Sequence, residues 1–218
     1  MMHPTAIVFD LDGTLIHSAP DLHFASNVAL KAFDREPLDL ATIISFIGNG
    51  VEKLVERILR ATGGTNENLQ RDALRIFLDV YEKNMTTLTR PYPGVVPALE
   101  AFRAQGVRLG ICTNKPTGPA REICEQLDLA KYFDVIVGAE PSQPKKPDPA
   151  SLMRSIEVLG CPKNEALYVG DSSIDYHTAI NGAVTFRLFA GGYLNEPLPN
   201  LSGADKFDDW SVHGILTK

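Results

Sequence analysis

Cysteine is scarce in this sequence, which has only Cys112, Cys124 and Cys161 among its 218 residues. Their number is odd and their spacing matches no zinc-binding pattern, so we expect neither a disulfide framework nor a zinc-stabilised fold. Reduced thiols are typical of cytoplasmic proteins, and we therefore expect this protein in the cytoplasm.

Long apolar runs and an excess of basic residues are also missing. No apolar stretch approaches the roughly 20 residues of a membrane-spanning helix, and the first apolar run begins too early to follow a signal peptide. Lys and Arg number 21 against 27 Asp and Glu, which gives a net charge of -6. We therefore expect no membrane and no nucleic acid among the partners.

The residues that are present favour a globular α/β protein, with 44% hydrophobic and 22% charged residues. Short runs rich in Val, Ile and Leu are typical of buried parallel strands, and they cover residues 6–9, 107–112, 135–137, 166–169 and 184–188. Helical patterns lie between most of them, at 98–105, 119–127 and 151–159. This alternation predicts a doubly wound parallel sheet, a Rossmann-like core.

The alternation is interrupted between Ser18 and about Thr89, where no strand pattern occurs. Helical patterns take its place at 21–33, 40–46, 51–62 and 67–88. We therefore expect a core made of residues 1–16 and 90–218, with a helical module inserted at 17–89.

Acidic clusters follow two of the expected strands. Asp10 and Asp12 come directly after the first strand and face the same side, while Asp171 and Asp175 follow the run at 166–169. Aspartate is common in any turn or helix cap, so neither pair alone indicates a site. Four ionised carboxylates at one sheet edge would repel one another, and a hard cation relieves this. Since the set contains no His or Cys, Mg²⁺ is expected rather than zinc.

Polar residues follow two further strands, at the edge where open α/β sheets bind ligands. Thr113 and Asn114 offer a hydroxyl and an amide ahead of a helix, which suits an anion, although a helix-capping loop would look the same. Lys146 precedes Pro147, which holds it extended. We expect Lys146, together with Mg²⁺, to balance the acidic residues.

In this order and spacing, the four clusters resemble the motifs of the haloacid dehalogenase superfamily of phosphatases. Asp10-Leu-Asp-Gly-Thr-Leu15 is similar to the first motif, Thr113 to the second, Lys146 to the third and Gly170-Asp-Ser-Ser-Ile-Asp175 to the fourth. The helical insertion resembles the cap that this family carries after its first motif.

Two segments of the insertion resemble the phosphoglycolate phosphatases of bacteria. They are Ser18-Ala-Pro-Asp-Leu22 and Phe46-Ile-Gly-Asn-Gly-Val51. His17 departs from that pattern, because those enzymes usually carry an aspartate there.

The resemblance implies a role for each motif residue. Asp10 would attack phosphorus and form an aspartyl-phosphate, and Asp12 would act as general acid and then as general base. The phosphoryl oxygens would be held by Thr113, Asn114 and Lys146. Mg²⁺ would be bound by Asp10, the main-chain carbonyl of Asp12 and Asp171. Asp175 would act through a water molecule or by contacting the residues that bind the ion.

The substrate implied is a small phosphorylated metabolite, foremost 2-phosphoglycolate. The alternative substrates are a sugar phosphate, a nucleotide or pyrophosphate. The alternative functions are a phosphomutase like β-phosphoglucomutase and a non-catalytic protein that binds a phosphometabolite. A dehalogenase is disfavoured, because that branch lacks the second acid that Asp12 supplies. The oligomeric state is open between monomer and homodimer.

Discrimination among these substrates is expected in the turn Gly48-Asn49-Gly50, whose N–H groups precede a helix and suit a carboxylate. The alternative is that Gly48 and Gly50 merely join two helices. Asn49 is the side chain of interest in this turn, with His17 and Lys115 as further candidates.

Overall fold

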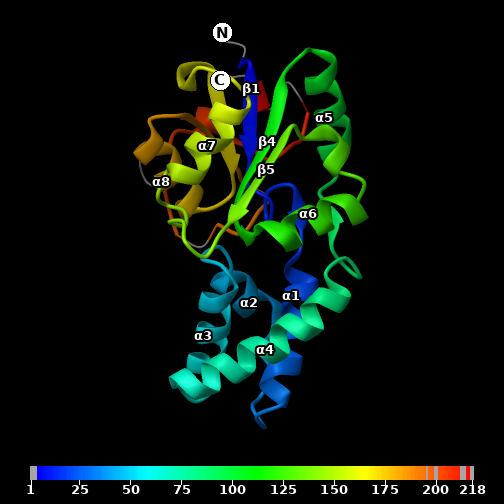
Figure 1. Ribbon diagram of the computed structural model, residues 1–218, viewed down its shortest axis with the longest axis vertical. Coiled ribbons are helices and arrows are strands. Elements are labelled where there is room, and N and C mark those ends of the chain that lie inside the picture. The colour runs from blue at the N-terminus through cyan, green and yellow to red at the C-terminus, as the bar shows by residue number, and fades with distance from the viewer. Residues whose placement is uncertain (1–3, 195, 199–200, 212–214, 217–218) are drawn as a thin grey trace. The chain divides into compact units, whose positions relative to one another are not determined.

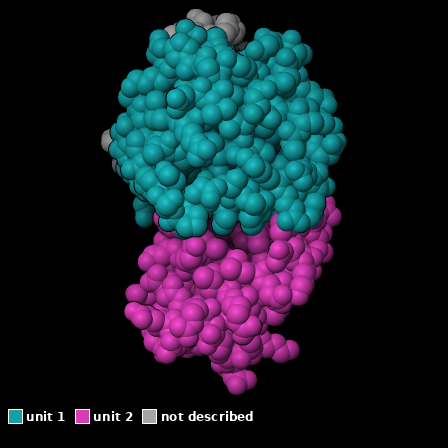
Figure 2. Space-filling view, viewed as in Figure 1, with its two compact units in different colours: residues 1–17, 91–218 teal, residues 18–90 magenta. Residues whose placement is uncertain are grey.

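The computed structural model describes residues 4–194, 196–198, 201–211 and 215–216. It contains two compact units, coloured separately in Figure 2: Met1–His17 with Pro91–Lys218, called here the core unit, and Ser18–Arg90, called the helical unit. The boundaries expected from the sequence, 16/17 and 89/90, each lie one residue before those of these two units, 17/18 and 90/91. That the helical unit acts as a cap stays a prediction.

The core unit is built on a six-stranded sheet with the order β5-β4-β1-β6-β7-β8, in which neighbouring strands run parallel (Figure 1). The predicted doubly wound, Rossmann-like core is thereby confirmed. The strands are β1 (Ala6–Phe9), β4 (Arg108–Pro116), β5 (Val135–Ala139), β6 (Ala166–Gly170), β7 (Thr185–Phe189) and β8 (Lys206–Phe207).

The central strand β1 is fully buried because it has a neighbour on each side and helices over both faces of the sheet. Its first residue, Ala6, pairs with Arg108 of β4 and with Ala166 of β6. The helices of this unit are α5 (Val95–Ala104), α6 (Thr117–Gln126), α7 (Ala150–Val158) and α8 (Ser173–Gly182), with short 3₁₀ turns at Ala130–Tyr132, Lys163–Glu165 and Gly203–Asp205. Parallel order places the carboxyl ends of β1, β4 and β6 at one edge.

The helical unit consists of α1 (Ala19–Lys31), α2 (Leu40–Phe46), α3 (Val51–Ala61) and α4 (Glu67–Asn84). Side chains of Asp39 and Asn66 cap the first turns of α2 and α4 by accepting main-chain N–H bonds. Helix α3 buries the stripe that its spacing predicts, Leu54, Val55, Ile58 and Leu59. Among the described residues, no helix is both long enough and apolar enough to cross a membrane.

Three short strands and one strand end differ from the expectation. The two-residue strands β2 (Ile16–His17), β3 (Arg90–Pro91) and β8 are too short to show a periodic pattern. Strand β4 was expected to end at Cys112, but it continues to Pro116 with an irregular register after Cys112. Thr113, Asn114 and Lys115 therefore lie within a buried strand and not in a loop after it.

The return of the chain at the end of the helical unit is tied to α1 by one buried carboxylate. Asp21, 1% exposed, accepts hydrogen bonds from the main-chain N–H groups of Leu88 at 3.0 Å and Thr89 at 2.8 Å. It also accepts the Thr89 hydroxyl at 2.7 Å. The two donors of Thr89 have no solvent to replace the carboxylate, since Thr89 is fully buried.

We expect Asp21→Ala to lower the free energy of unfolding by about 1–3 kcal/mol, because it leaves buried N–H and O–H donors without an acceptor. Urea unfolding followed by circular dichroism measures this change. The matched control is Asp72→Ala, which removes an exposed carboxylate 3.9 Å from Arg71 and should leave the unfolding midpoint unchanged. Equal midpoints for both variants would contradict the structural role of Asp21.

Candidate active site

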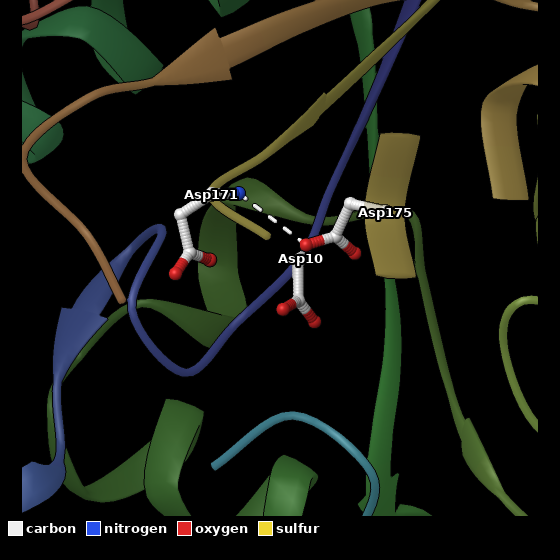
Figure 3. A group of neighbouring side chains, drawn as sticks. All are labelled: Asp10, Asp171 and Asp175. Atoms are coloured by element: carbon white, nitrogen blue, oxygen red, sulfur yellow. Dashed lines mark hydrogen bonds between the residues drawn. The ribbon is translucent and has the colours of Figure 1, made fainter. Parts of the chain in front are cut away.

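Three buried carboxylates meet at the carboxyl edge of the sheet (Figure 3). Asp10 follows β1, Asp171 follows β6, and Asp175 lies in the first turn of α8; one oxygen of each lies within 4.8 Å of the others. Because β1 and β6 are neighbours, their ends bring the predicted acidic clusters together.

Lys146 lies among these acids and is itself 4% exposed. Its Nζ is 2.9 Å from Oδ1 of Asp10 and 2.6 Å from Oδ1 of Asp175. It also donates to the Tyr168 hydroxyl at 2.9 Å and to the Cys112 carbonyl at 3.1 Å. The predicted pairing of Lys146 with the acidic cluster is thus present in the geometry.

Burial dominates the protonation of these groups. It raises the pKa of Asp10 to about 7, against the opposing attraction of Lys146. Burial and the neighbouring carboxylates of Asp175 and Asp10 raise the pKa of Asp171 well above its usual range. Burial also acts to raise the pKa of Asp175, but Lys146 and the hydrogen bonds outweigh it, and that pKa is lowered. One lysine is therefore too little positive charge for three carboxylates.

The donor set fits a hard divalent cation. It consists of buried carboxylate oxygens, and the partner of Asp10 Oδ1 among the described side chains is the ammonium group of Lys146, 2.9 Å away, which is shared with Asp175. Both Asp175 oxygens, in contrast, are engaged: Oδ1 by Lys146 and Tyr168, and Oδ2 by the Ser172 hydroxyl at 2.6 Å. Asp175 is therefore better placed to hold other groups than to bind a cation directly.

The turn after β1 brings the first acidic cluster against Asp171. Gly13 has a φ of +91°, and a Cβ there would lie 2.3 Å from Oδ2 of Asp171, so no other residue fits without displacement. Thr14 donates its hydroxyl to Oδ1 of Asp171 at 2.5 Å. The Asp12 carboxylate does not join the three buried acids; it pairs with Lys115, whose Nζ lies 3.1 and 3.2 Å from its two oxygens.

The side chain of Asn114 bonds to the main chain of Lys146 on both sides of its amide. Its Oδ1 accepts the main-chain N–H of Lys146 at 2.8 Å, and its Nδ2 donates to the Lys146 carbonyl at 3.1 Å. These two bonds hold the main chain of Lys146 in place. That Asn114 also holds phosphoryl oxygens stays a prediction. Thr113, which accepts the Lys115 N–H at 3.2 Å, remains at the site edge.

The residues expected to govern substrate choice have partners of their own. His17 Nδ1 is 2.9 Å from the Tyr193 hydroxyl. Within the helical unit, Asn49 accepts a bond from Arg57 at 2.7 Å through its Oδ1. Gly48 and Gly50 both have positive φ, at 118° and 87°, so the turn itself requires glycine. A role of Gly48, Asn49 and His17 in specificity stays a prediction.

Two site residues were missed by sequence reasoning. Tyr168 lies in β6 and contacts both Lys146 and Asp175, and a polar side chain in an otherwise apolar strand leading to Asp171 was the available signal. The Tyr193 N–H donates to Oδ2 of Asp171 at 2.7 Å. Tyr193 lies far along the sequence from every motif, so no sequence signal pointed to it.

The comparisons with known proteins agree with this geometry. A family model described as haloacid dehalogenase-like hydrolase matches residues 7–188. A phosphoglycolate phosphatase of Cereibacter sphaeroides is 44% identical over 89% of either chain, and one of Rhodospirillum rubrum is 39% identical over 97% of this chain and 90% of its own. A crystal structure of a predicted phosphoglycolate phosphatase from Haemophilus somnus superposes with a TM-score of 0.88, at 30% identity, covering 98% of this chain and 97% of its own.

Tyr168→Phe should lower kcat/KM for p-nitrophenyl phosphate about tenfold, because it removes a hydroxyl that bonds to both members of the Lys146–Asp175 pair. Steady-state kinetics measures the change. Tyr176→Phe, the same chemical change on the partly exposed face of α8, is the matched control and should retain full activity. Equal kcat/KM for both variants and the wild type would show that the hydroxyl does not support Lys146.

Proposed function

This chain belongs to the haloacid dehalogenase-like hydrolase family, and we propose that it is a Mg²⁺-dependent phosphatase acting through an aspartyl-phosphate. The observation that carries this proposal is the meeting of Asp10, Asp171 and Asp175 with Lys146 at the carboxyl edge of the sheet. A nucleophilic carboxylate, a fixed cation and carboxylate ligands are what phosphoryl transfer through an enzyme carboxylate requires.

The reaction divides into two displacements. Asp10 attacks phosphorus, the bond to the ester oxygen breaks, and Asp12 gives its proton to the departing alkoxide. Asp12 then takes a proton from a water molecule as that water attacks phosphorus. The acyl-phosphate bond breaks, and inorganic phosphate and the free Asp10 carboxylate are released.

The groups around Asp10 hold the phosphoryl oxygens as negative charge spreads over them. Lys146 lies 2.9 Å from Oδ1 of Asp10, so its ammonium group is within reach of any oxygen on a phosphorus bound there. The hydroxyl of Thr113 is the second group assigned to these oxygens. Asn114 is the third group assigned to these oxygens, and its amide also holds the main chain of Lys146.

The cation is assigned to Asp10, Asp171 and the main-chain carbonyl of Asp12, with Asp175 contacting it through water. Carboxylate and carbonyl oxygens without His or Cys suit Mg²⁺. When bound, Mg²⁺ neutralises charge on the phosphoryl group and orients it.

For the substrate we propose 2-phosphoglycolate, supported by the names of the relatives at 44% and 39% identity. We place the reaction in the cytoplasm, since all three cysteines are buried free thiols. The helical unit would act as a cap over the reaction.

The test is a panel of phosphorylated metabolites with released phosphate as the readout. With Mg²⁺, 2-phosphoglycolate should show a higher kcat/KM than glucose 6-phosphate, AMP or pyrophosphate, and EDTA should abolish turnover. Asp10→Asn should reduce turnover to near background by removing the nucleophile. A clear preference for a sugar phosphate or nucleotide would overturn the substrate alone; substantial turnover by Asp10→Asn would overturn the covalent mechanism.

Asp12→Asn should separate proton transfer from binding. It should lower kcat by about 10²–10⁴ on an alkyl phosphate, whose alkoxide needs a proton to leave. The loss should be much smaller on p-nitrophenyl phosphate, whose leaving group is stable without one. Equal losses on the two substrates would remove the acid role from Asp12.

A further inference from the structure

A second buried lysine lies beside the residue that must meet the leaving group. Lys115, on β4, is 8% exposed, and its Nζ bonds to both oxygens of Asp12 at 3.1 and 3.2 Å. Both residues belong to the core unit. Lysine is rarely buried to this degree, and its charge requires a partner when it is.

The phosphoryl chemistry does not account for this second charge. Lys146 already lies against the nucleophile, 2.9 Å from Oδ1 of Asp10. Lys115 instead contacts the acid assigned to the leaving oxygen. The two lysines thus sit at opposite ends of the bond that breaks: one at phosphorus, the other at the departing group.

The acid role proposed for Asp12 changes the charge balance of the Lys115–Asp12 pair. Asp12 has to bring an oxygen within about 2.6–3.2 Å of the ester oxygen to protonate it. Each Asp12 oxygen can accept more than one hydrogen bond, so this approach is compatible with Nζ of Lys115 staying beside Asp12. When Asp12 carries the proton it no longer supplies a negative charge opposite Lys115, and a second anion beside this buried ammonium group becomes favourable.

A carboxylate next to the ester oxygen supplies that anion. In 2-phosphoglycolate the carboxylate and the ester oxygen are bonded to the same CH₂ carbon, which places their oxygens about 3 Å apart by ordinary bond lengths. A side chain that contacts Asp12, as Lys115 does, is therefore within hydrogen-bonding distance of the substrate carboxylate when Asp12 contacts the ester oxygen. A charge-assisted bond of this kind discriminates against a substrate that lacks the anion.

We propose that Lys115 is a specificity-determining residue that binds this carboxylate and selects phosphomonoesters bearing an anionic group on the carbon next to the ester oxygen. The proposal rests on the proposed function and deepens it. It assigns the discrimination between substrates to a residue of the core unit, whereas the turn Gly48-Asn49-Gly50 belongs to the helical unit. Asn49 is neutral and already bonded to Arg57, so it offers less discrimination between a carboxylate and a neutral group.

The test compares two esters that differ in the far group: 2-phosphoglycolate, with a carboxylate, and ethyl phosphate, with a methyl. The measured quantity is the ratio of their kcat/KM values, in which any common effect on Asp12 cancels. Lys115→Met should lower this ratio about 10- to 100-fold, as expected for loss of a bond to a charged group. Lys115→Arg, which keeps the charge, should retain more of the ratio. Lys131→Met removes an exposed lysine of the same unit and should leave the ratio unchanged.

Binding without turnover gives a second readout. In the Asp10→Asn background, calorimetry should show weaker binding of 2-phosphoglycolate after Lys115→Met, with little change for ethyl phosphate. A ratio that survives Lys115→Met while both rates fall equally would overturn the proposal and leave the phosphatase assignment intact. A wild-type protein that hydrolyses other phosphomonoesters but shows no preference for the carboxylate over the methyl group would overturn it too. Failure to hydrolyse any phosphomonoester would overturn both proposals.

Discussion

The buried ammonium group of Lys146 is the interaction on which the site depends. It contacts Asp10 after β1, Cys112 in β4, Tyr168 in β6 and Asp175 in α8, so that one charge connects three neighbouring strands and a helix. An unpaired charge at this depth would be strongly destabilising. The central strands must therefore keep their parallel order and register for the lysine to be tolerated, and the Asn114 amide holds its main chain in place.

The same lysine leaves the site with an excess of negative charge. Its attraction lowers the pKa of Asp175, whereas the pKa values of Asp10 and Asp171 are raised by burial. Asp175 is thus the acid that Lys146 neutralises, and the other two are left to a ligand of opposite charge. The division follows from contacts: both Asp175 oxygens accept hydrogen bonds, and Lys146 lies closer to Asp175, at 2.6 Å, than to Asp10, at 2.9 Å. The excess of negative charge at Asp10 and Asp171 opposes folding and makes this cluster a candidate for binding a cation.

Periodicity and strand-end rules predicted much of this architecture. The apolar run 6–9 has the same bounds as β1, and the helical pattern 40–46 has the same bounds as α2. The meeting of Asp10 with Asp171 follows from parallel topology, which the alternation of strands and helices indicates. Side-chain partners could not be predicted in this way. The bonds of Asn114 to Lys146, and of Tyr193 to Asp171, join residues far apart in sequence and depend on how the strands are registered.

The extension of β4 beyond Cys112 shows how a small local difference changes the chemistry. Loops usually run over the surface of a protein, and a lysine in a loop after Cys112 would be expected to contact solvent. Because the strand continues to Pro116, residues 113–115 are buried, and Lys115 is held against Asp12. Burial removes competition from water and makes a charged contact selective. Strand β4 thus carries both Thr113, the group assigned to the phosphate, and Lys115, the cation beside the acid assigned to the leaving group.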